Sequence, residues 1–353
     1  MTGIERIDAV LRGETPDYLP VVPQSFMFAA QSIGTRIGLI SRSPAELARS
    51  HISCQEKYGY DGCVIDIDDA SLAEACGAKV IWRENDVAFV DENHPVLEDL
   101  RDIDELEMPD PYKSGRLCEW LEVTERLKSA LGDHVWIMGR ADQGPFSVLS
   151  LLRGAQNFMI DLLEEDEDVI LHALEWAAKA HTAFAKAQLS AGAHATSMGD
   201  SYASPELISP KMYRDFAFEY EKECVEAVQT DGKPYSVHIC GDTSKIIADM
   251  GRLGARILEV DWKLDMGEAR KIVPENTVLM GNVDPSRILV QGKPEDVSDN
   301  VRRIIGETLG KGVIISSGCA IGANTPPENF SALISAAREY GSFERLCELR
   351  EKK

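Results

Sequence analysis

Short apolar runs alternate with helical stretches along the whole chain, and this alternation most constrains what the chain can fold into. Several of these runs are dominated by apolar residues without a clean alternation, which is typical of strands covered on both faces. Helical stretches such as 164–190 and 295–310 separate the runs. The eight expected strands are 20–26, 61–68, 134–141, 192–200, 234–241, 255–262, 277–284 and 312–319.

Eight strands alternating with helices predict an α/β fold with a parallel sheet, and their number favours closure into a (β/α)₈ TIM barrel. An open doubly wound sheet is the alternative, which periodicity alone does not exclude. The G-x-G-x-x-G sequence of dinucleotide-binding folds is absent after the first strand. We expect one domain over residues 1–353, with helical additions at 1–19 and 36–60 and an inserted β-hairpin at 80–90.

Charge and apolar content exclude several classes of protein. The 59 acidic residues exceed the 37 lysines and arginines, giving a net charge of −22 that repels nucleic-acid phosphates. No apolar run approaches the ~18 residues of a membrane span, and no secretory signal is visible at the first residues. We therefore expect a cytoplasmic protein that binds neither nucleic acid nor membrane.

The eight cysteines are dispersed through a long chain, which argues against a disulfide framework. Either all of them are small apolar residues and surface thiols, or a few of them bind a metal. Two of them stand at the ends of expected strands. His238 and Cys240 end the run PYSVHICG, and Cys319 ends the run GVIISSGC.

Residues i and i+2 of a strand point to the same face, so His238 and Cys240 can converge on one point. Catalytic groups of a barrel collect at the carboxyl ends of its strands, where Cys319 also lies. One imidazole and two thiolates suit Zn²⁺, and Asp261 at the end of an intervening strand is the candidate fourth ligand. The opposing interpretation is a chance His-x-Cys pair with ordinary buried thiols, which spacing alone leaves open.

The charge of such a centre indicates its chemistry. Zn²⁺ with two thiolates and a neutral imidazole carries no net charge. It can hold a substrate thiol as its thiolate, or polarise the oxygen of a substrate ether. Both routes suit the transfer of an alkyl group.

The segments HICGDTSKIIADM, VDWKLDM, GNVDPSRIL and SSGCAIGANTPPENF resemble the uroporphyrinogen decarboxylase superfamily. They are most similar to its corrinoid-linked methyltransferase branch, which includes the methylcobamide:coenzyme M methyltransferases. The similarity runs from the N-terminal helix to about residue 341, and the decarboxylases themselves lack the His-x-Cys…Cys signature. The resemblance implies a TIM barrel, a catalytic zinc held by His238, Cys240 and Cys319, and a corrinoid-carrying partner protein. It also places Asp261 where the family has an acidic residue that can fill the fourth zinc position.

One segment departs from the decarboxylases. They carry an Arg-rich R-Q-A-G-R segment after the first strand, whose arginines hold the carboxylates of a tetrapyrrole. The corresponding segment here is VPQSFMFAAQSIG, and no arginine occurs from Val21 to Thr35. This loss of charge-assisted hydrogen bonds disfavours a tetrapyrrole substrate. The alternatives are a decarboxylase-like enzyme without metal and a barrel that binds metal without catalysis.

Three further residues are candidates for the active site. Asp68 aligns with an acidic residue that both branches of the superfamily carry after the second strand, and Asp200 and Tyr202 follow the fourth strand. The opposing interpretation of Asp68 is a solvated acid in an acidic protein. The zinc ligands suit a methylated donor, such as a methyl ether, and a thiol acceptor, such as coenzyme M, equally well. The direction of methyl transfer therefore stays open.

Overall fold

The computed structural model describes residues 1–66, 68–230 and 232–352. Ile67, which belongs to the expected strand 61–68, lies outside the described residues, as do Asp231 and Lys353. Parallel strands form most of the sheet structure. They are β1 (Gly62–Ile65), β4 (Trp136–Gly139), β5 (Thr196–Gly199), β6 (Tyr235–His238), β7 (Ile257–Glu259), β8 (Val278–Val283) and β9 (Val313–Ser317).

The strands form a closed ring. β5 to β9 pair in chain order, and β1 pairs with β4. Backbone hydrogen bonds from Gly139 N to the Ala195 carbonyl (2.9 Å) and from Ala141 N to the Ser197 carbonyl (2.7 Å) join β4 to β5. The segment at Val21 supplies the eighth strand, because its carbonyl accepts from Asp61 N (2.9 Å) and it bridges Ile315 of β9 in parallel. The fold is therefore a (β/α)₈ barrel, as expected, and the open sheet is excluded.

Side chains alternate between the inside and the outside of this ring. One buried cluster fills the barrel interior. It comprises Ile7, Val10, Val22, Val64, Trp136, Met138, Ala195, Ile257, Val278, Met280 and Ile314. The intervening strand residues, such as Val237 and Leu258, belong to a second and larger core that packs against the helices. This burial on both faces explains why the strand sequences lack a polar alternation.

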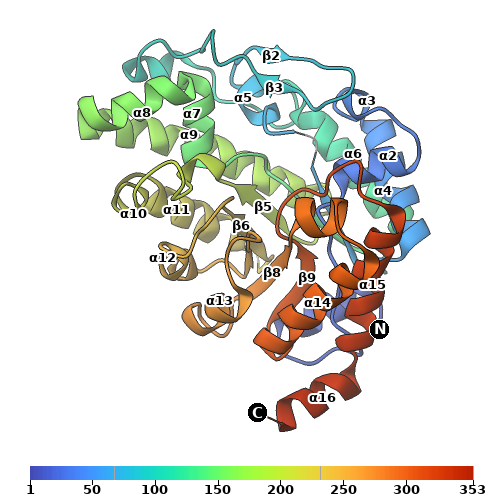
Figure 1. Ribbon diagram of the computed structural model, residues 1–353. Helices are drawn as coiled ribbons and strands as arrows, with labels where there is room; N and C mark the ends of the chain where they lie inside the picture. Colours follow the sequence, from blue (N-terminus) through green and yellow to red (C-terminus); the bar gives the residue numbers. More distant parts are fainter. Residues whose placement is uncertain (67, 231, 353) are drawn as a thin grey trace.

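Helices surround the strands (Figure 1). The α-helices are α1 (Gly3–Leu11), α2 (Phe26–Ser32), α3 (Ile37–Ile40), α4 (Pro44–Tyr58), α5 (Ser71–Ala75), α6 (Leu117–Leu131), α7 (Pro145–Arg153), α8 (Ala155–Glu164), α9 (Glu167–Ser190), α10 (Pro210–Met212), α11 (Phe218–Gln229), α12 (Ile247–Arg252), α13 (Met266–Ile272), α14 (Pro294–Thr308), α15 (Pro327–Tyr340) and α16 (Phe343–Glu351). Shorter or irregular turns are η1 (Leu100–Glu105), η2 (Ser201–Ala203), η3 (Tyr213–Ala217) and η4 (Pro285–Val290). Within the described chain, no helix has both the length and the apolar character that crossing a bilayer requires.

The expected additions have different roles in the structure. Helix α1 closes the amino-terminal end of the barrel, since Ile7 and Val10 pack into the interior cluster. The hairpin forms within 80–90 as β2 (Val80–Ile81) and β3 (Phe89–Val90), which pair antiparallel. Helix α4, which we expected as an addition within 36–60, connects the Val21 strand to β1 and packs on α6, so it takes the place of a barrel helix.

The expected helix 164–190 is present as α9, which begins three residues later, at Glu167. Helix α8 ends at Glu164, Glu165 is extended, and α9 begins at Glu167. The acidic residues of this segment therefore cap and start α9, where the helix dipole favours negative charge. Leu174, Ala177 and Phe184 of α9 are buried and form its apolar face.

Acid should destabilise the protein through His51, a residue of α4. Its side chain is 0% exposed, and neither ring nitrogen has a hydrogen-bond partner among the described residues. Burial lowers the pKa of His51 from 6.5 to about 4. Between these two values only the unfolded chain takes up the proton, so this contribution is complete above pH 6.5 and is lost as the pH falls towards 4.

We predict that His51→Leu flattens the dependence of unfolding free energy on pH between 4 and 6.5, by up to about one proton. Urea titrations at several pH values measure this slope. His134→Leu is the matched control, because His134 is exposed whereas His51 is buried. An unchanged slope in His51→Leu would contradict the assignment.

Candidate metal centre

Three potential metal ligands converge at the carboxyl ends of the strands. His238 is the last residue of β6, Cys240 follows two positions later, and Cys319 lies just beyond β9. His238 Nε2 is 3.2 Å from Cys240 Sγ, and the two sulfur atoms are 3.9 Å apart. All three ligand atoms lie within 4.8 Å of one another, and no other such group occurs among the residues that the structure describes.

These spacings fit a zinc ion. In a tetrahedral site with Zn–S near 2.3 Å and Zn–N near 2.0 Å, two sulfur ligands are about 3.8 Å apart, and a nitrogen and a sulfur about 3.6 Å. The measured separations of 3.9 Å and 3.2 Å are close to those values. One imidazole and two thiolates also have the softness that zinc prefers over magnesium or calcium. The residues present therefore fit Zn²⁺ with one coordination position left open.

The imidazole of His238 is oriented by its second nitrogen. Nδ1 lies 3.0 Å from the main-chain carbonyl oxygen of Glu259 in β7. A carbonyl oxygen only accepts, so Nδ1 carries the proton and donates it to this bond. Nε2 is thereby left as the nitrogen that faces Cys240, which is the arrangement usual for a histidine that binds a metal.

The three groups share their protons unequally. Cys240 accepts a hydrogen bond from the Cys319 thiol and lies beside His238, and these contacts lower its pKa to about 3 although burial opposes ionisation. The same contact with Cys240, together with burial, raises the pKa of Cys319 well above its ordinary value. Burial lowers the pKa of His238, but the Cys240 thiolate and the Glu259 carboxylate outweigh it and raise the value to about 9. Cys240 is therefore a thiolate at neutral pH.

Asp261 lies close to the potential metal ligands but is not a member of their group. It is buried two residues beyond β7, and its Oδ1 accepts a hydrogen bond from Lys263 N at 2.9 Å. Burial raises the pKa of this carboxyl. It is not among the residues whose ligand atoms all lie within 4.8 Å of one another.

Asp68 and Asp200 are both buried, and the oxygens of each accept several hydrogen bonds. Asp68 pairs with both terminal nitrogens of Arg116, at 2.6 and 3.2 Å, and also accepts from Ser71 Oγ. Asp200 accepts from Ser147 N at 2.8 Å and from Phe146 N at 3.3 Å, at the start of α7. These contacts connect the two acids to neighbouring helices of the barrel.

Tyr202 is half-buried in η2, two residues beyond Asp200. Its hydroxyl donates to Glu92 Oε1 at 3.1 Å. Burial and the nearby Glu92 carboxylate raise the pKa of this phenol to about 12, so it keeps its proton at neutral pH.

The structure adds two polar side chains that sequence reasoning did not single out near the thiols. Ser201 Oγ is 3.4 Å from Cys240 Sγ. Asp69 is exposed and accepts from Gln143 Nε2 at 2.8 Å. The surrounding protein and the charges on Cys240 and Asp68 raise the pKa of Asp69 to about 6. In the run DIDD the sequence carries no signal that separates Asp69 from Asp68.

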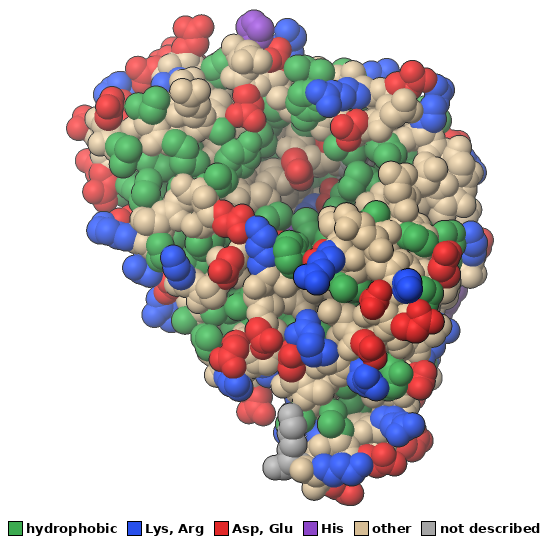
Figure 2. Space-filling model, in the orientation of Figure 1, with side chains coloured by type: hydrophobic (Ala, Val, Ile, Leu, Met, Phe, Trp, Pro, Cys, Tyr) green, Lys and Arg blue, Asp and Glu red, His purple; other side chains and the backbone are tan. Residues whose placement is uncertain are grey.

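The hairpin β2–β3 belongs to the connection between β1 and α6, so it lies on the side of the barrel where the strands end. Below the segment that carries this hairpin, the surface is hollowed, and acidic side chains are visible in the hollow (Figure 2). Around it, lysines and arginines are interspersed with acidic residues. The visible face therefore has no extended basic patch.

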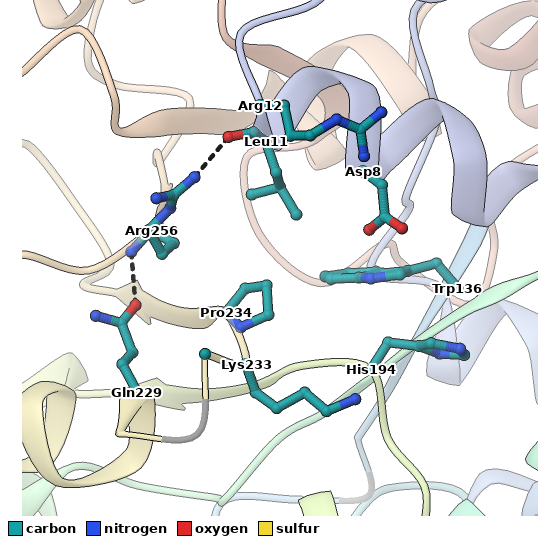
Figure 3. Close-up of a pocket in the computed structure, with 10 residues that line it drawn as sticks. Asp8, Leu11, Arg12, Trp136, His194, Gln229, Lys233, Pro234 and Arg256 are labelled. Carbon is teal, nitrogen blue, oxygen red and sulfur yellow. Dashed lines mark hydrogen bonds between the residues drawn. The ribbon is translucent and has the colours of Figure 1, made fainter.

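A separate cavity of about 510 Å³ lies at the opposite, amino-terminal end of the barrel. The ring of Trp136 lies between Asp8 and His194 in this cavity, and Arg256 reaches the Leu11 carbonyl across it (Figure 3). None of the three potential metal ligands lines this cavity. We therefore place the candidate active site at the carboxyl ends of the strands.

Comparison with known proteins shows the family of the chain. The sequence profile of the uroporphyrinogen decarboxylase (URO-D) family matches residues 2–340. The chain is 29% identical over 284 residues to a methylcobamide:CoM methyltransferase (MtbA) of Methanosarcina mazei, covering 80% of each protein. It is 28% identical over 313 residues to a uroporphyrinogen decarboxylase of Anaeromyxobacter dehalogenans, covering 86% of this chain and 87% of that protein. A solved structure of a methyltransferase from Methanosarcina mazei superposes with a TM-score of 0.88 at 26% identity, over 96% of this chain and 99% of the other.

If Cys240 and Cys319 are zinc ligands, replacing either one should lower the affinity for zinc. Cys240→Ser and Cys319→Ser should each weaken zinc binding by more than about 100-fold, because a hydroxyl is a poor substitute for a thiolate. Zinc content after dialysis against a chelator measures this. Cys347→Ser is the control and should retain one zinc per chain, since Cys347 lies in α16. Full zinc content in either single variant would contradict the assignment.

Proposed function

The chain belongs to the uroporphyrinogen decarboxylase family, and we propose that it is a zinc-dependent methyltransferase. It moves a methyl group between a small molecule and a corrinoid carried by a partner protein. The observation that carries this proposal is the convergence of His238, Cys240 and Cys319 within 4.8 Å. The likeness to a methyltransferase over nearly the full length of both chains supports it.

Zinc, when bound, supplies a Lewis acid that lowers the pKa of a substrate thiol or polarises the oxygen of a substrate methyl ether. The two cysteine thiolates would balance the charge of the zinc, and its Lewis acidity would still stabilise a substrate atom that becomes negative. His238, fixed by its bond to Glu259, contributes a neutral ligand. In this proposal the fourth position belongs to the substrate, since Asp261 accepts a hydrogen bond from Lys263 N and is not a member of the cluster.

The remaining polar residues organise the site. Ser201 beside Cys240 donates a hydrogen bond that stabilises the thiolate. Asp69, held by Gln143, offers a carboxylate at the open side of the site for orienting the substrate. The contacts of Asp68 and Asp200 favour a supporting role, in which each fixes a loop at a strand end. Tyr202, bonded to Glu92, borders the same side.

The transfer balances in either direction. With a thiol acceptor, the substrate sulfur forms a bond to the methyl carbon, and the cobalt–carbon bond breaks with its electron pair left on cobalt. With a methyl ether donor, the reduced cobalt attacks the methyl carbon, and the oxygen leaves with the electron pair of the broken bond. A cytoplasmic location and coenzyme M as the acceptor are compatible with this proposal.

A metal-free decarboxylase is the competing function in this family. Such an enzyme must hold a substrate with several carboxylates, but the segment from Val21 to Thr35, which includes α2, carries no arginine. The apolar side chains of Phe26 and Phe28 are buried there instead. This segment favours the methyltransferase.

The absorbance of cobalamin tests the proposal directly. Zinc-loaded protein should convert methylcobalamin in the presence of an acceptor thiol such as coenzyme M, or should methylate reduced cobalamin from a methyl ether. Cys240→Ser and Cys319→Ser should lose at least about 100-fold in rate, because each removes a zinc ligand. Cys347→Ser should keep the parental rate. Full activity in both ligand variants, or decarboxylation of a tetrapyrrole by metal-free protein, would overturn the proposal.

A further inference from the structure

The barrel interior changes from apolar to charged directly below the metal centre. Inward-facing positions of the lower layer are Val22, Val64, Met138 and Ile257. Two residues further along each of these strands, the inward positions hold Gln24, Asp66, Arg140 and Glu259, all of which are buried. Burying charge is costly unless it is paired, so a charged layer inside a barrel requires an explanation.

Glu259 is the centre of this layer. Its Oε1 accepts from Ser236 Oγ at 2.9 Å and from Arg140 Nη1 at 3.2 Å. Its Oε2 accepts from Arg140 Nη2 at 2.8 Å and from Gln24 Nε2 at 3.2 Å. Four donors from three different strands therefore fix this one carboxylate.

Arg140 is held equally firmly from the opposite side. Besides its two bonds to Glu259, its Nη1 donates to the Met198 carbonyl at 3.2 Å, and its Nε lies 3.5 Å from Asp66 Oδ2. The guanidinium thus contacts Glu259 on one side and Met198 and Asp66 on the other, and these contacts fix the position of the Glu259 carboxylate.

The same residue also contacts the metal centre through its backbone. Glu259 pairs with His238 in the register of β6 and β7, and its carbonyl accepts the Nδ1 proton of His238 at 3.0 Å. Ser236, which binds the Glu259 carboxylate, lies two residues before His238 on β6 and faces the same way. Glu259 on β7 therefore contacts β6 at two positions. Its carboxylate binds Ser236, and its carbonyl oxygen binds the imidazole of His238.

We propose that Glu259, held by Arg140, is a positioning residue that keeps the imidazole of His238 in the orientation required for binding the metal. The inference rests on the proposed zinc centre and extends it to the layer below. A buried ion pair is weak support for stability, since well-packed apolar residues usually replace one without loss. An apolar layer would not hold β7 against β6 through these hydrogen bonds, so it would not fix the orientation of the His238 imidazole.

Variants that remove the whole pair separate the two roles. Arg140→Met/Glu259→Leu removes both charges of the pair together, so its melting temperature should stay near that of the parent, although Asp66 loses its contact with Arg140. Its zinc affinity, measured by competition with a chelator, should fall by about 10- to 100-fold. With Co²⁺ in place of zinc, its thiolate-to-metal and ligand-field absorption bands should shift, because His238 binds in a changed orientation.

A matched pair at the other end of the barrel provides the control. Arg6 and Asp61 form a buried ion pair of 2.9 Å before the start of β1, and both residues are less than 9% exposed. Arg6→Met/Asp61→Leu removes a buried pair away from the metal centre, so it should change neither the zinc affinity nor the Co²⁺ spectrum. Ser236→Ala and Glu259→Gln are milder variants of the upper layer, in which the same shifts should appear at reduced size.

Parental zinc affinity and an unshifted Co²⁺ spectrum in Arg140→Met/Glu259→Leu would overturn the proposal, as would an equal loss of affinity in the Arg6 and Asp61 control. If the upper double variant does not fold, Ser236→Ala and Glu259→Gln decide the question by the same two measurements. A parent protein that binds Co²⁺ through thiolates but transfers no methyl group contradicts the proposed function alone. A parent that binds neither metal overturns both.

Discussion

Closure of the strand ring is the constraint on which the metal centre depends. Cys240 and Cys319 are 79 residues apart and follow strands separated by two others, β7 and β8. In a flat sheet three strand spacings would hold them about 14 Å apart. Their sulfur atoms are 3.9 Å apart because the ring curves, and inward-facing residues of non-adjacent strands meet near its axis. The bonds between the Val21 segment, β1 and β9 therefore contribute to the site although they lie far from it in sequence.

Sequence reasoning predicted the barrel and the three converging residues, because both depend on local patterns. Strand runs are apolar, and a His-x-Cys pair at a strand end presents both side chains to one face. The hydrogen-bond partners of the surrounding acidic residues could not be predicted from the sequence. Whether Asp68, Asp200 or Asp261 is free depends on partners such as Arg116 and Ser147, which are distant in sequence and become neighbours only after folding.

The sequence did contain an indication that Glu259 has a special role. It is a charged residue inside the short strand ILE of a barrel whose neighbouring inward position, Ile257, is apolar. Such a residue needs a buried partner, and Arg140 inside another expected strand has the opposite charge. The pairing itself required the structure, because strand order and register decide which buried charges meet. The net charge of −22, in contrast, does not explain the pairing of Glu259 with Arg140 or of Asp68 with Arg116.

The central claim is that two cysteine sulfurs and one imidazole of this barrel bind zinc. X-ray absorption at the zinc edge, on the zinc-loaded protein, measures this most directly. We predict two sulfur neighbours at about 2.3 Å and one imidazole nitrogen at about 2.0 Å. At saturating zinc, Cys240→Ser should show one sulfur neighbour in place of two. A shell made only of oxygen and nitrogen neighbours, or one unchanged in Cys240→Ser, would contradict it.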